Sequence, residues 1–232
     1  MNYALIFAGG VGSRMGSETP KQFIEVNGKP IIVHTIAVFD DSKIIDKIVV
    51  VTLPEYIHKV EEYIVKFNLF KVSAVISGGG TAMESQFNGL KFIKKTSNEN
   101  DLVFIHDGVR PFINNKLLED CLNSVRFKGN AITVCRATET ISILNSNNQI
   151  EKILPRQKCI LARAPQAFFI DDIYNAHLKV GNKRNDFVDS ASLMMSQNVK
   201  LNIVEGPSEN IKITTQYDLM LCELWMNKNE KD

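Results

Sequence analysis

A glycine-rich stretch near the start of the chain holds the residue types that bind phosphate groups. It reads AGGVGSRMG over 8–16 and is followed by PKQF over 20–23. Glycines let backbone N–H groups come close to phosphate oxygens, and Arg14 and Lys21 add positive charge beside them. The stretch therefore predicts a phosphate-binding loop, with a purely structural glycine turn as the alternative.

Two common phosphate motifs do not fit this stretch. A dinucleotide fingerprint needs G-x-G-x-x-G, but after Gly10 and Gly12 the third glycine falls one place late, at Gly16. A Walker A loop needs G-K followed by Ser or Thr, and the sequence contains no such run. We therefore expect a phosphate loop of another type.

The surrounding sequence predicts an α/β fold, a Rossmann-like and mostly parallel sheet with helices on both faces. Short β-rich runs alternate with longer helical patterns, which is typical of right-handed crossovers. The expected strands are 3–8, 48–52, 72–77, 102–106, 130–135 and 201–204. The expected helices are 31–38, 55–67, 83–95, 117–125, 171–180, 189–196 and 217–226.

Unusual residues follow three of the expected strands. The glycine stretch follows the first, Gly78-Gly79-Gly80 follows the third, and HDGVRP over 106–111 ends the fourth. In an open parallel sheet, ligands bind outside the carboxyl ends of the strands. We expect these segments to share one site.

The segment 139–156 interrupts the strand–helix alternation. Two strand-like runs, 140–144 and 149–154, surround Asn145-Ser146-Asn147-Asn148, which predicts a β-hairpin. We expect an arm that projects from the sheet, with a hairpin packed on its own domain as the alternative.

Composition excludes several classes of protein. With 27 basic and 26 acidic residues the net charge is +1, which argues against a broad nucleic-acid surface or a polybasic membrane anchor. No apolar run approaches the roughly 20 residues that span a bilayer, and the first residues show no leader pattern. The four cysteines are far apart and form no C-x-x-C pair. We expect a cytoplasmic protein with reduced thiols that binds neither nucleic acid nor membrane.

The pattern G-G-x-G-S-R-M-G…P-K-Q-F resembles the sugar-nucleotide pyrophosphorylase superfamily. More closely, it is similar to the cytidylyltransferases of methylerythritol 4-phosphate and ribitol 5-phosphate. Further matches run in order along the chain: G-G-x(5)-S-x-x-N-G-L at 78–90, HDGVRP at 106–111, APQAF at 164–168 and ENIKITTQYDL at 209–219. The resemblance implies one nucleotidyltransferase domain over 1–232, with 139–156 as a β-arm that interlocks two subunits of a homodimer.

The implied reaction is attack of an acceptor phosphate oxygen on the α-phosphorus of CTP, with pyrophosphate leaving. Two polyanions must meet, so cations and Mg²⁺ are needed to position and neutralise them. The resemblance assigns catalysis to Arg14, Lys21 and Lys212, and the metal to Asp107. It assigns nucleotide binding to Ala8, Gly9, Gly10, Gly12, Gly79, Gly80, Ser85 and Asp107.

Taken without the resemblance, some of these residues have simpler explanations. Asp107 would fit a helix cap or turn, Lys212 a solvated charge, and Ser85 an ordinary position on a helix face. His106 fits a structural role better than a catalytic one.

For the acceptor, the resemblance implicates Arg110, Thr140 and Arg156, and Arg163 is a candidate replacement cation. The methylerythritol enzymes usually have an arginine at the position of Ala82 and threonines at those of Ala164 and Val188. These departures favour ribitol 5-phosphate or a close relative as the acceptor. Methylerythritol phosphate, as in isoprenoid synthesis, and a non-catalytic nucleotide-binding relative remain the alternatives.

Overall fold

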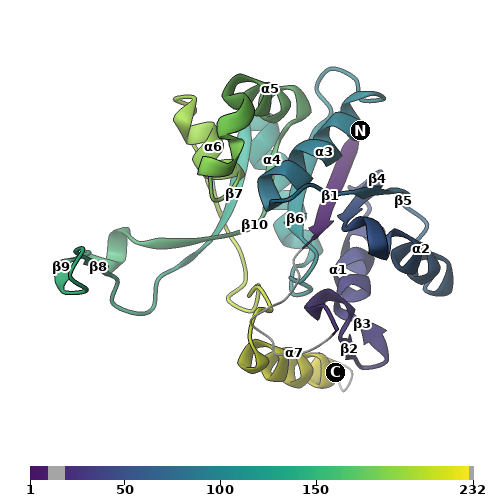
Figure 1. Cartoon of the computed structure of the whole chain (residues 1–232), viewed down its shortest axis with the longest axis horizontal. Helices are drawn as coiled ribbons and strands as arrows, with labels where there is room; N and C mark the ends of the chain where they lie inside the picture. Colours follow the sequence, from purple (N-terminus) through teal and green to yellow (C-terminus); the bar gives the residue numbers. More distant parts are fainter. Residues whose placement is uncertain (10–18, 230–232) are drawn as a thin grey trace.

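The protein is built on a seven-stranded, mostly parallel sheet (Figure 1). The computed structural model describes residues 1–9 and 19–229. The strand order is β11-β7-β10-β6-β1-β4-β5, and β10 runs antiparallel to both of its neighbours. The strands of this sheet are β1 (Asn2–Ala8), β4 (Lys47–Thr52), β5 (Val72–Ser77), β6 (Leu102–Asp107), β7 (Asn130–Arg136), β10 (Ile160–Phe169) and β11 (Ile203–Glu205).

Helices cover both faces of the sheet, as the alternation predicts. One face packs against α1 (Ile31–Asp40), α2 (Ile57–Lys66) and α4 (Asn115–Lys128). The other packs against α3 (Ala82–Lys94), α5 (Ile170–Val180) and α6 (Ser190–Ser196). Because successive side chains of a strand point to opposite faces, β1 and β4 each contribute to both cores and read as continuous apolar runs.

A smaller third core lies under the C-terminal helix α7 (Gln216–Asn229). It packs against the short hairpin of β2 (Glu25–Val26) and β3 (Lys29–Pro30). Asn27 and Gly28 have φ angles of 48° and 73°, the left-handed pair that a tight two-residue hairpin turn requires. The described residues also contain the 3₁₀ segments η2 (Lys21–Phe23), η3 (Pro54–Tyr56), η4 (Arg156–Lys158) and η5 (Gly181–Asp186).

Strand β10 is the one strand of the main sheet that the sequence pattern does not predict. It lies in the middle of the sheet, between β6 and β7, although its ten residues include Arg163 and Pro165. The pairing of β10 with β7 shifts register between Ala162 and Gln166. A proline has no N–H to donate to a strand ladder, and it is tolerated at such an irregularity. Because the run contains this proline and an arginine, its sequence does not show the pattern of a central strand.

Helix starts next to the site are fixed by local side chains. The Thr81 hydroxyl accepts the Glu84 N–H at 3.2 Å and begins α3. Asp189 and Ser192 form a reciprocal capping box that begins α6. These caps hold residues 82–86 and 189–190 in place along the same side of the sheet.

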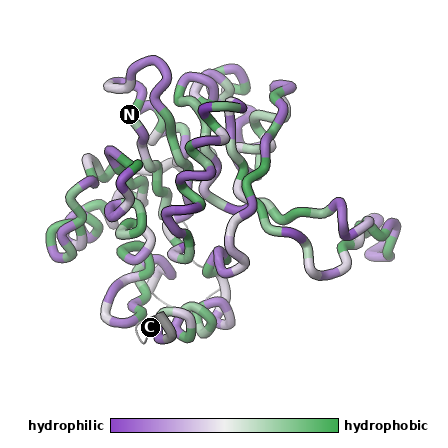
Figure 2. Tube along the Cα trace, turned by 180° about the vertical axis from the view of Figure 1, so that it is seen from behind, coloured by the Kyte–Doolittle hydropathy of each residue, from purple (hydrophilic) through white to green (hydrophobic). Residues whose placement is uncertain are grey.

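The segment after β7 forms the expected hairpin. Strands β8 (Ser142–Leu144) and β9 (Ile150–Ile153) make a separate two-stranded sheet that extends away from the main one (Figure 1). Figure 2 shows hydrophobic segments along this arm, and Ile143, Leu144, Ile150 and Ile153 are exposed on it. The arm therefore leaves apolar surface uncovered within one chain.

No helix in the described part of the chain has the length and apolar character needed to cross a membrane.

Two buried histidines make stability depend on pH. Burial lowers the pKa of His106 to about 4, and burial together with the Arg184 guanidinium lowers the pKa of His177 to about 3. In the unfolded chain a histidine titrates near ~6.5. Below that value the unfolded chain binds more protons than the folded one, so the free energy of unfolding falls as pH falls.

We expect acidification from pH 7 to pH 5 to cost roughly 2 kcal/mol for each of these histidines. Urea unfolding at pH 7, 6 and 5 measures this loss. His177→Gln should reduce the pH dependence, whereas the control His58→Gln should not, because His58 is exposed. Equal pH dependence in the wild type and His177→Gln would contradict the assignment.

Candidate functional site

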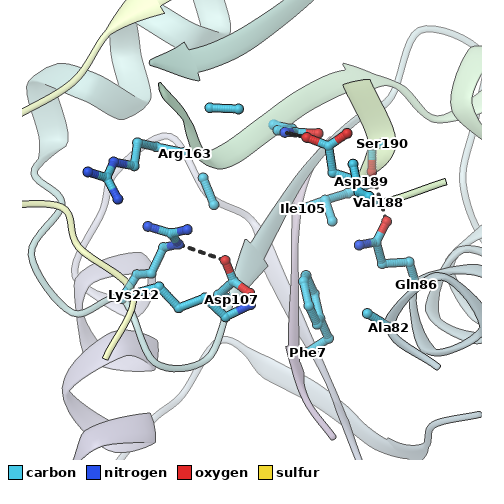
Figure 3. Close-up of a pocket in the computed structure, with 14 residues that line it drawn as sticks. Phe7, Ala82, Gln86, Ile105, Asp107, Arg163, Val188, Asp189, Ser190 and Lys212 are labelled. Carbon is cyan, nitrogen blue, oxygen red and sulfur yellow. Dashed lines mark hydrogen bonds and ion pairs between the residues drawn. The ribbon is translucent and has the colours of Figure 1, made fainter. Parts of the chain in front are cut away.

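A pocket lies beside the carboxyl ends of β1 and β6, where the sequence predicts a site (Figure 3). Its charged lining residues come from β6 and its following turn, from β10, and from the segments before α6 and α7. The lining residues are Phe7, Ala82, Gln86, Ile105, Asp107, Arg110, Ala162, Arg163, Ala164, Gln166, Val188, Asp189, Ser190 and Lys212.

The centre of the charged side is the carboxylate of Asp107, which ends β6. Lys212 Nζ lies 2.6 Å from its Oδ1, and Arg110 Nε lies 2.6 Å from its Oδ2. Burial by itself raises the pKa of Asp107, but Lys212 and Arg110 outweigh burial and hold the pKa at about 2. Asp107 is therefore an ion-paired carboxylate. It caps none of the described helices, but it does begin the expected turn, because its carbonyl accepts the Arg110 N–H at 3.2 Å.

Hydrogen bonds from side chains to backbone carbonyls join this cluster to β10. Arg110 Nη1 donates to the Asn210 carbonyl at 3.0 Å, and Asn210 Nδ2 donates to the Ala164 carbonyl at 2.6 Å. Asn210 is fully buried. Segments that are far apart in the sequence are thus held against one another. Lys212 remains partly exposed to solvent, but its charge is paired with Asp107.

His106 has a structural role in this cluster, as expected. It is fully buried, its Nε2 lies 3.0 Å from the Arg110 carbonyl, and its ring packs edge-on against Phe39. With its pKa lowered to about 4, it is neutral at physiological pH.

The glycine turn after β5 is braced by the first turn of α3. The Gly79 N–H donates to Ser85 Oγ at 3.1 Å, and the Gly80 N–H donates to Glu84 Oε2 at 2.8 Å. A Cβ on Gly79 would lie 2.4 Å from the Glu84 Cβ, so this close approach requires glycine. Ser85 is buried and its hydroxyl holds the turn, so it is more than an ordinary helix-face residue.

The same serine also lies next to the end of β1. A Cβ on Gly9 would be in ordinary contact with Ser85 Oγ, at 3.6 Å. Gln22 Nε2 donates to the Ala8 carbonyl at 3.0 Å, which holds η2 and the buried Lys21 against that end. The structure therefore gathers Ala8, Gly9, Lys21 and the Gly79–Gly80 turn. The predicted loop residues Gly10, Gly12 and Arg14 lie outside the described residues.

The predicted acceptor residues divide into two groups. Arg110 and Arg163 line the pocket, and Arg163 Nε donates to Cys135 Sγ at 3.3 Å. Thr140 and Arg156 are exposed at the arm and do not line this pocket; Arg156 Nη1 donates to the Thr138 carbonyl at 3.1 Å. One chain therefore does not bring all four acceptor residues together.

Ala82 on α3, Ala164 on β10 and Val188 just before α6 line the same pocket as Lys212. The sequence singles them out as departures from the methylerythritol pattern, and the structure brings them together. Sequence reasoning misses Gln86, Gln166, Asp189 and Ser190, which also line the pocket. Gln166 lies in the APQAF motif, but nothing local in the sequence marks the other three as pocket residues.

Metal ligands are sparse in this region. Among residues 1–9 and 19–229, no group of three or more His, Cys, Asp or Glu side chains could hold a metal ion. Asp107 is the predicted metal ligand, and both of its oxygens already face cations.

Known proteins are similar to this chain over nearly its whole length. The model of the 2-C-methyl-D-erythritol 4-phosphate cytidylyltransferase (IspD) family matches residues 3–228. A ribitol-5-phosphate cytidylyltransferase of Streptococcus agalactiae is 42% identical, covering 100% of this chain and 98% of the relative. One from Vibrio parahaemolyticus is 40% identical, covering 99% and 98%. A 2-C-methyl-D-erythritol 4-phosphate cytidylyltransferase of Clostridium acetobutylicum is 35% identical, covering 99% of each chain.

Solved structures give the same answer for the fold. The 4-diphosphocytidyl-2C-methyl-D-erythritol synthase of Anaerococcus prevotii superposes with a TM-score of 0.83 at 27% identity, covering 97% of this chain and 96% of the other. Because the family model matches nearly every residue and relatives of about 40% identity cover the full chain, the chain belongs to the IspD family of cytidylyltransferases.

Proposed function

We propose that this cytidylyltransferase uses ribitol 5-phosphate, or a closely related linear polyol phosphate, as its acceptor. An acceptor phosphate oxygen forms a bond to the α-phosphorus of CTP, the bond from that phosphorus to the bridging oxygen breaks, and pyrophosphate leaves. The products are a CDP-alcohol and pyrophosphate. The full-length similarity to ribitol-5-phosphate cytidylyltransferases supports this proposal.

The observation that carries it is the group Ala82, Ala164 and Val188 in the pocket beside Lys212. Methylerythritol enzymes usually present an arginine and two threonine hydroxyls at these positions. Here the three side chains offer no hydrogen bond, so the acceptor must be held by other groups. A methylerythritol phosphate acceptor is the second candidate, favoured by the family match and by the relative from Clostridium acetobutylicum.

We assign roles by the charges that must meet. Lys212 would lie between the nucleotide and acceptor phosphates, and Arg14 and Lys21 would neutralise the triphosphate. Asp107 would hold Lys212 and Arg110 in position for the acceptor. Ala8, Gly9, Gly10 and Gly12 would form the phosphate loop, and Gly79, Gly80 and Ser85 the turn that faces the base and ribose.

Mg²⁺ fits this donor set as a cofactor. Mg²⁺ binds through one or two carboxylates together with substrate phosphate oxygens, rather than in an all-protein cage. Asp107 offers one carboxylate, whose oxygens keep lone pairs beyond those facing Lys212 and Arg110. When bound, the ion would neutralise charge on the triphosphate as the transition state forms.

The arm over 139–156 would complete the site of a second subunit in a two-fold dimer. Its exposed apolar side chains are expected to pair with another chain, because an isolated hairpin is marginally stable. Thr140 and Arg156 would then reach the partner's acceptor phosphate. We further propose that 1–232 acts as one nucleotidyltransferase domain.

We expect Lys212→Ala and Lys21→Met each to lower kcat by about 10²- to 10³-fold, because each removes a cation where charge develops. Pyrophosphate release with CTP, Mg²⁺ and ribitol 5-phosphate measures this. Lys95→Ala, an exposed lysine just after α3, is the control. Turnover within about threefold of wild type for both variants would contradict the roles.

The acceptor is tested by kcat/KM for ribitol 5-phosphate and for methylerythritol phosphate at saturating CTP. We expect the linear polyol phosphate to be preferred by about tenfold or more, since the lost hydroxyls and arginine each weaken the other acceptor. A clear preference for methylerythritol phosphate would overturn the assignment.

The shared site is tested by mixing two inactive variants. Arg156→Ala damages the site of the partner, and Lys212→Ala damages the site of its own subunit. After subunits exchange, each mixed dimer has one intact site, so the mixture should recover roughly a quarter of wild-type activity. No recovery, together with a fully active wild-type monomer in sedimentation, would refute the interlocked dimer.

A further inference from the structure

The pocket has two chemically different ends (Figure 3). Lys212, Asp107 and Arg163 lie at one end, where the cations gather. Gln86, Asp189 and Ser190 lie at the other, with the apolar side chains of Ala82 and Val188 beside them. The cationic end fits a phosphate, so the second end faces the remainder of the acceptor.

Gln86 is held in one orientation by a neighbour that is itself buried. Ser190 Oγ donates to Gln86 Oε1 at 2.8 Å, and the two residues are 1% and 4% exposed, respectively. Since the amide oxygen is engaged, the amide nitrogen is directed away from Ser190 and toward the pocket (Figure 3). The bond joins α3 to the start of α6, residues 104 positions apart.

The Gln86 amide nitrogen has hydrogen-bonding capacity to spare. A glutamine amide nitrogen carries two N–H donors. Within the described ranges, 1–9 and 19–229, neither donor has a hydrogen-bond partner. This nitrogen is not one of the buried unpaired side-chain atoms of the described residues, and Gln86 lines the pocket, so its N–H groups are available to a ligand oxygen.

Gln166 and Asp189, near this end of the pocket, already form hydrogen bonds within the protein. Gln166 Nε2 donates to Asp189 Oδ2 at 2.8 Å, and its Oε1 accepts the Ala191 N–H at 2.8 Å. Asp189 Oδ1 accepts the Ser192 N–H and caps α6. The Asp189 carboxylate also places negative charge here, which disfavours a phosphate and favours neutral hydroxyl groups.

We infer that Gln86, oriented by Ser190, donates hydrogen bonds to an acceptor hydroxyl far from the phosphate and so selects the length and hydroxylation of the polyol chain. This inference rests on the proposed function. Ala82 and Val188 cannot replace the amide, because their side chains carry no polar atom. A site built to bond a hydroxyl discriminates against the analogue that lacks it, because its own donors are then left unpaired.

The test combines enzyme variants with a shortened acceptor. Gln86→Met keeps the length of the side chain and removes the amide. The acceptors are ribitol 5-phosphate and erythritol 4-phosphate, which is one hydroxyl-bearing carbon shorter. The reaction is followed by pyrophosphate release with CTP and Mg²⁺.

We expect the wild type to prefer ribitol 5-phosphate. Gln86→Met should lower kcat/KM for ribitol 5-phosphate by about tenfold and change that for erythritol 4-phosphate by less than about twofold. The KM for CTP should stay unchanged. Ser190→Ala should shift selectivity in the same sense by a smaller factor. The control Gln197→Met, at the far end of α6, should not alter selectivity.

Equal losses on both acceptors would show that Gln86 only supports the fold and would overturn the inference. A wild type that does not distinguish the two acceptors would do the same. If Gln86→Met does not fold, Gln86→Glu keeps the acceptor for Ser190 and replaces the donors, and the same selective loss is expected. A wild type that turns over no linear polyol phosphate contradicts the proposed function, a result distinct from equal losses.

Discussion

A carboxylate held between two cations at the end of β6 is the interaction on which the site depends. Asp107 is 8% exposed and pairs with both Arg110 and Lys212. A buried charge without partners would cost several kcal/mol, so the surrounding segments must stay together to satisfy it. Through Asn210, the same cluster is tied to the Ala164 carbonyl on β10. One electrostatic constraint therefore fixes the positions of three segments that form the pocket.

The pocket is polarised in a way that suits a reaction between two anions. The cations lie at one end, whereas the Gln86 amide and the Asp189 carboxylate, which caps α6, lie at the other (Figure 3). In the proposed reaction, a phosphorylated alcohol would enter with its phosphate toward Lys212 and the end of β1. The cations would then lie where charge develops in phosphoryl transfer. The capping box fixes Asp189 and Ser190 at the start of α6, and the hydrogen bond from the Gly79 N–H to Ser85 Oγ braces the glycine turn against α3.

The arm differs from the rest of the molecule in the exposure of its apolar side chains. The sheet buries continuous apolar strands on both faces, whereas β8 and β9 leave Ile143, Leu144 and Ile150 in contact with solvent. Among the described residues of one chain, nothing covers these side chains, and two acceptor residues lie outside the pocket that they are predicted to serve. Completion of the site by a second subunit would account for both observations. The arm would bury its apolar side chains at the interface, and Thr140 and Arg156 would reach the partner's pocket.

Local patterns in the sequence determine most of the elements. Strand–helix alternation, the glycine turn after β5 and the hairpin after β7 can be predicted from the sequence, because each depends on neighbours in the chain. The resemblance to known families predicts Asp107 and Lys212 as site residues. From residue chemistry alone, Asp107 fits a helix cap or turn and Lys212 fits a solvated charge. Their pairing depends on segments that lie about a hundred positions apart, and the tertiary structure decides it.

The tertiary structure also decides the position of β10 and the partners of Gln86. A strand that contains an arginine and a proline resembles a loop until two neighbouring strands supply its hydrogen bonds. Gln86 resembles any helical glutamine until α6 brings Ser190 within 2.8 Å of it. Periodicity reports which face of an element is apolar, but not which distant element covers that face. Packing and the pairing of buried polar groups settle that choice, because their free energy depends on contacts that local sequence does not encode.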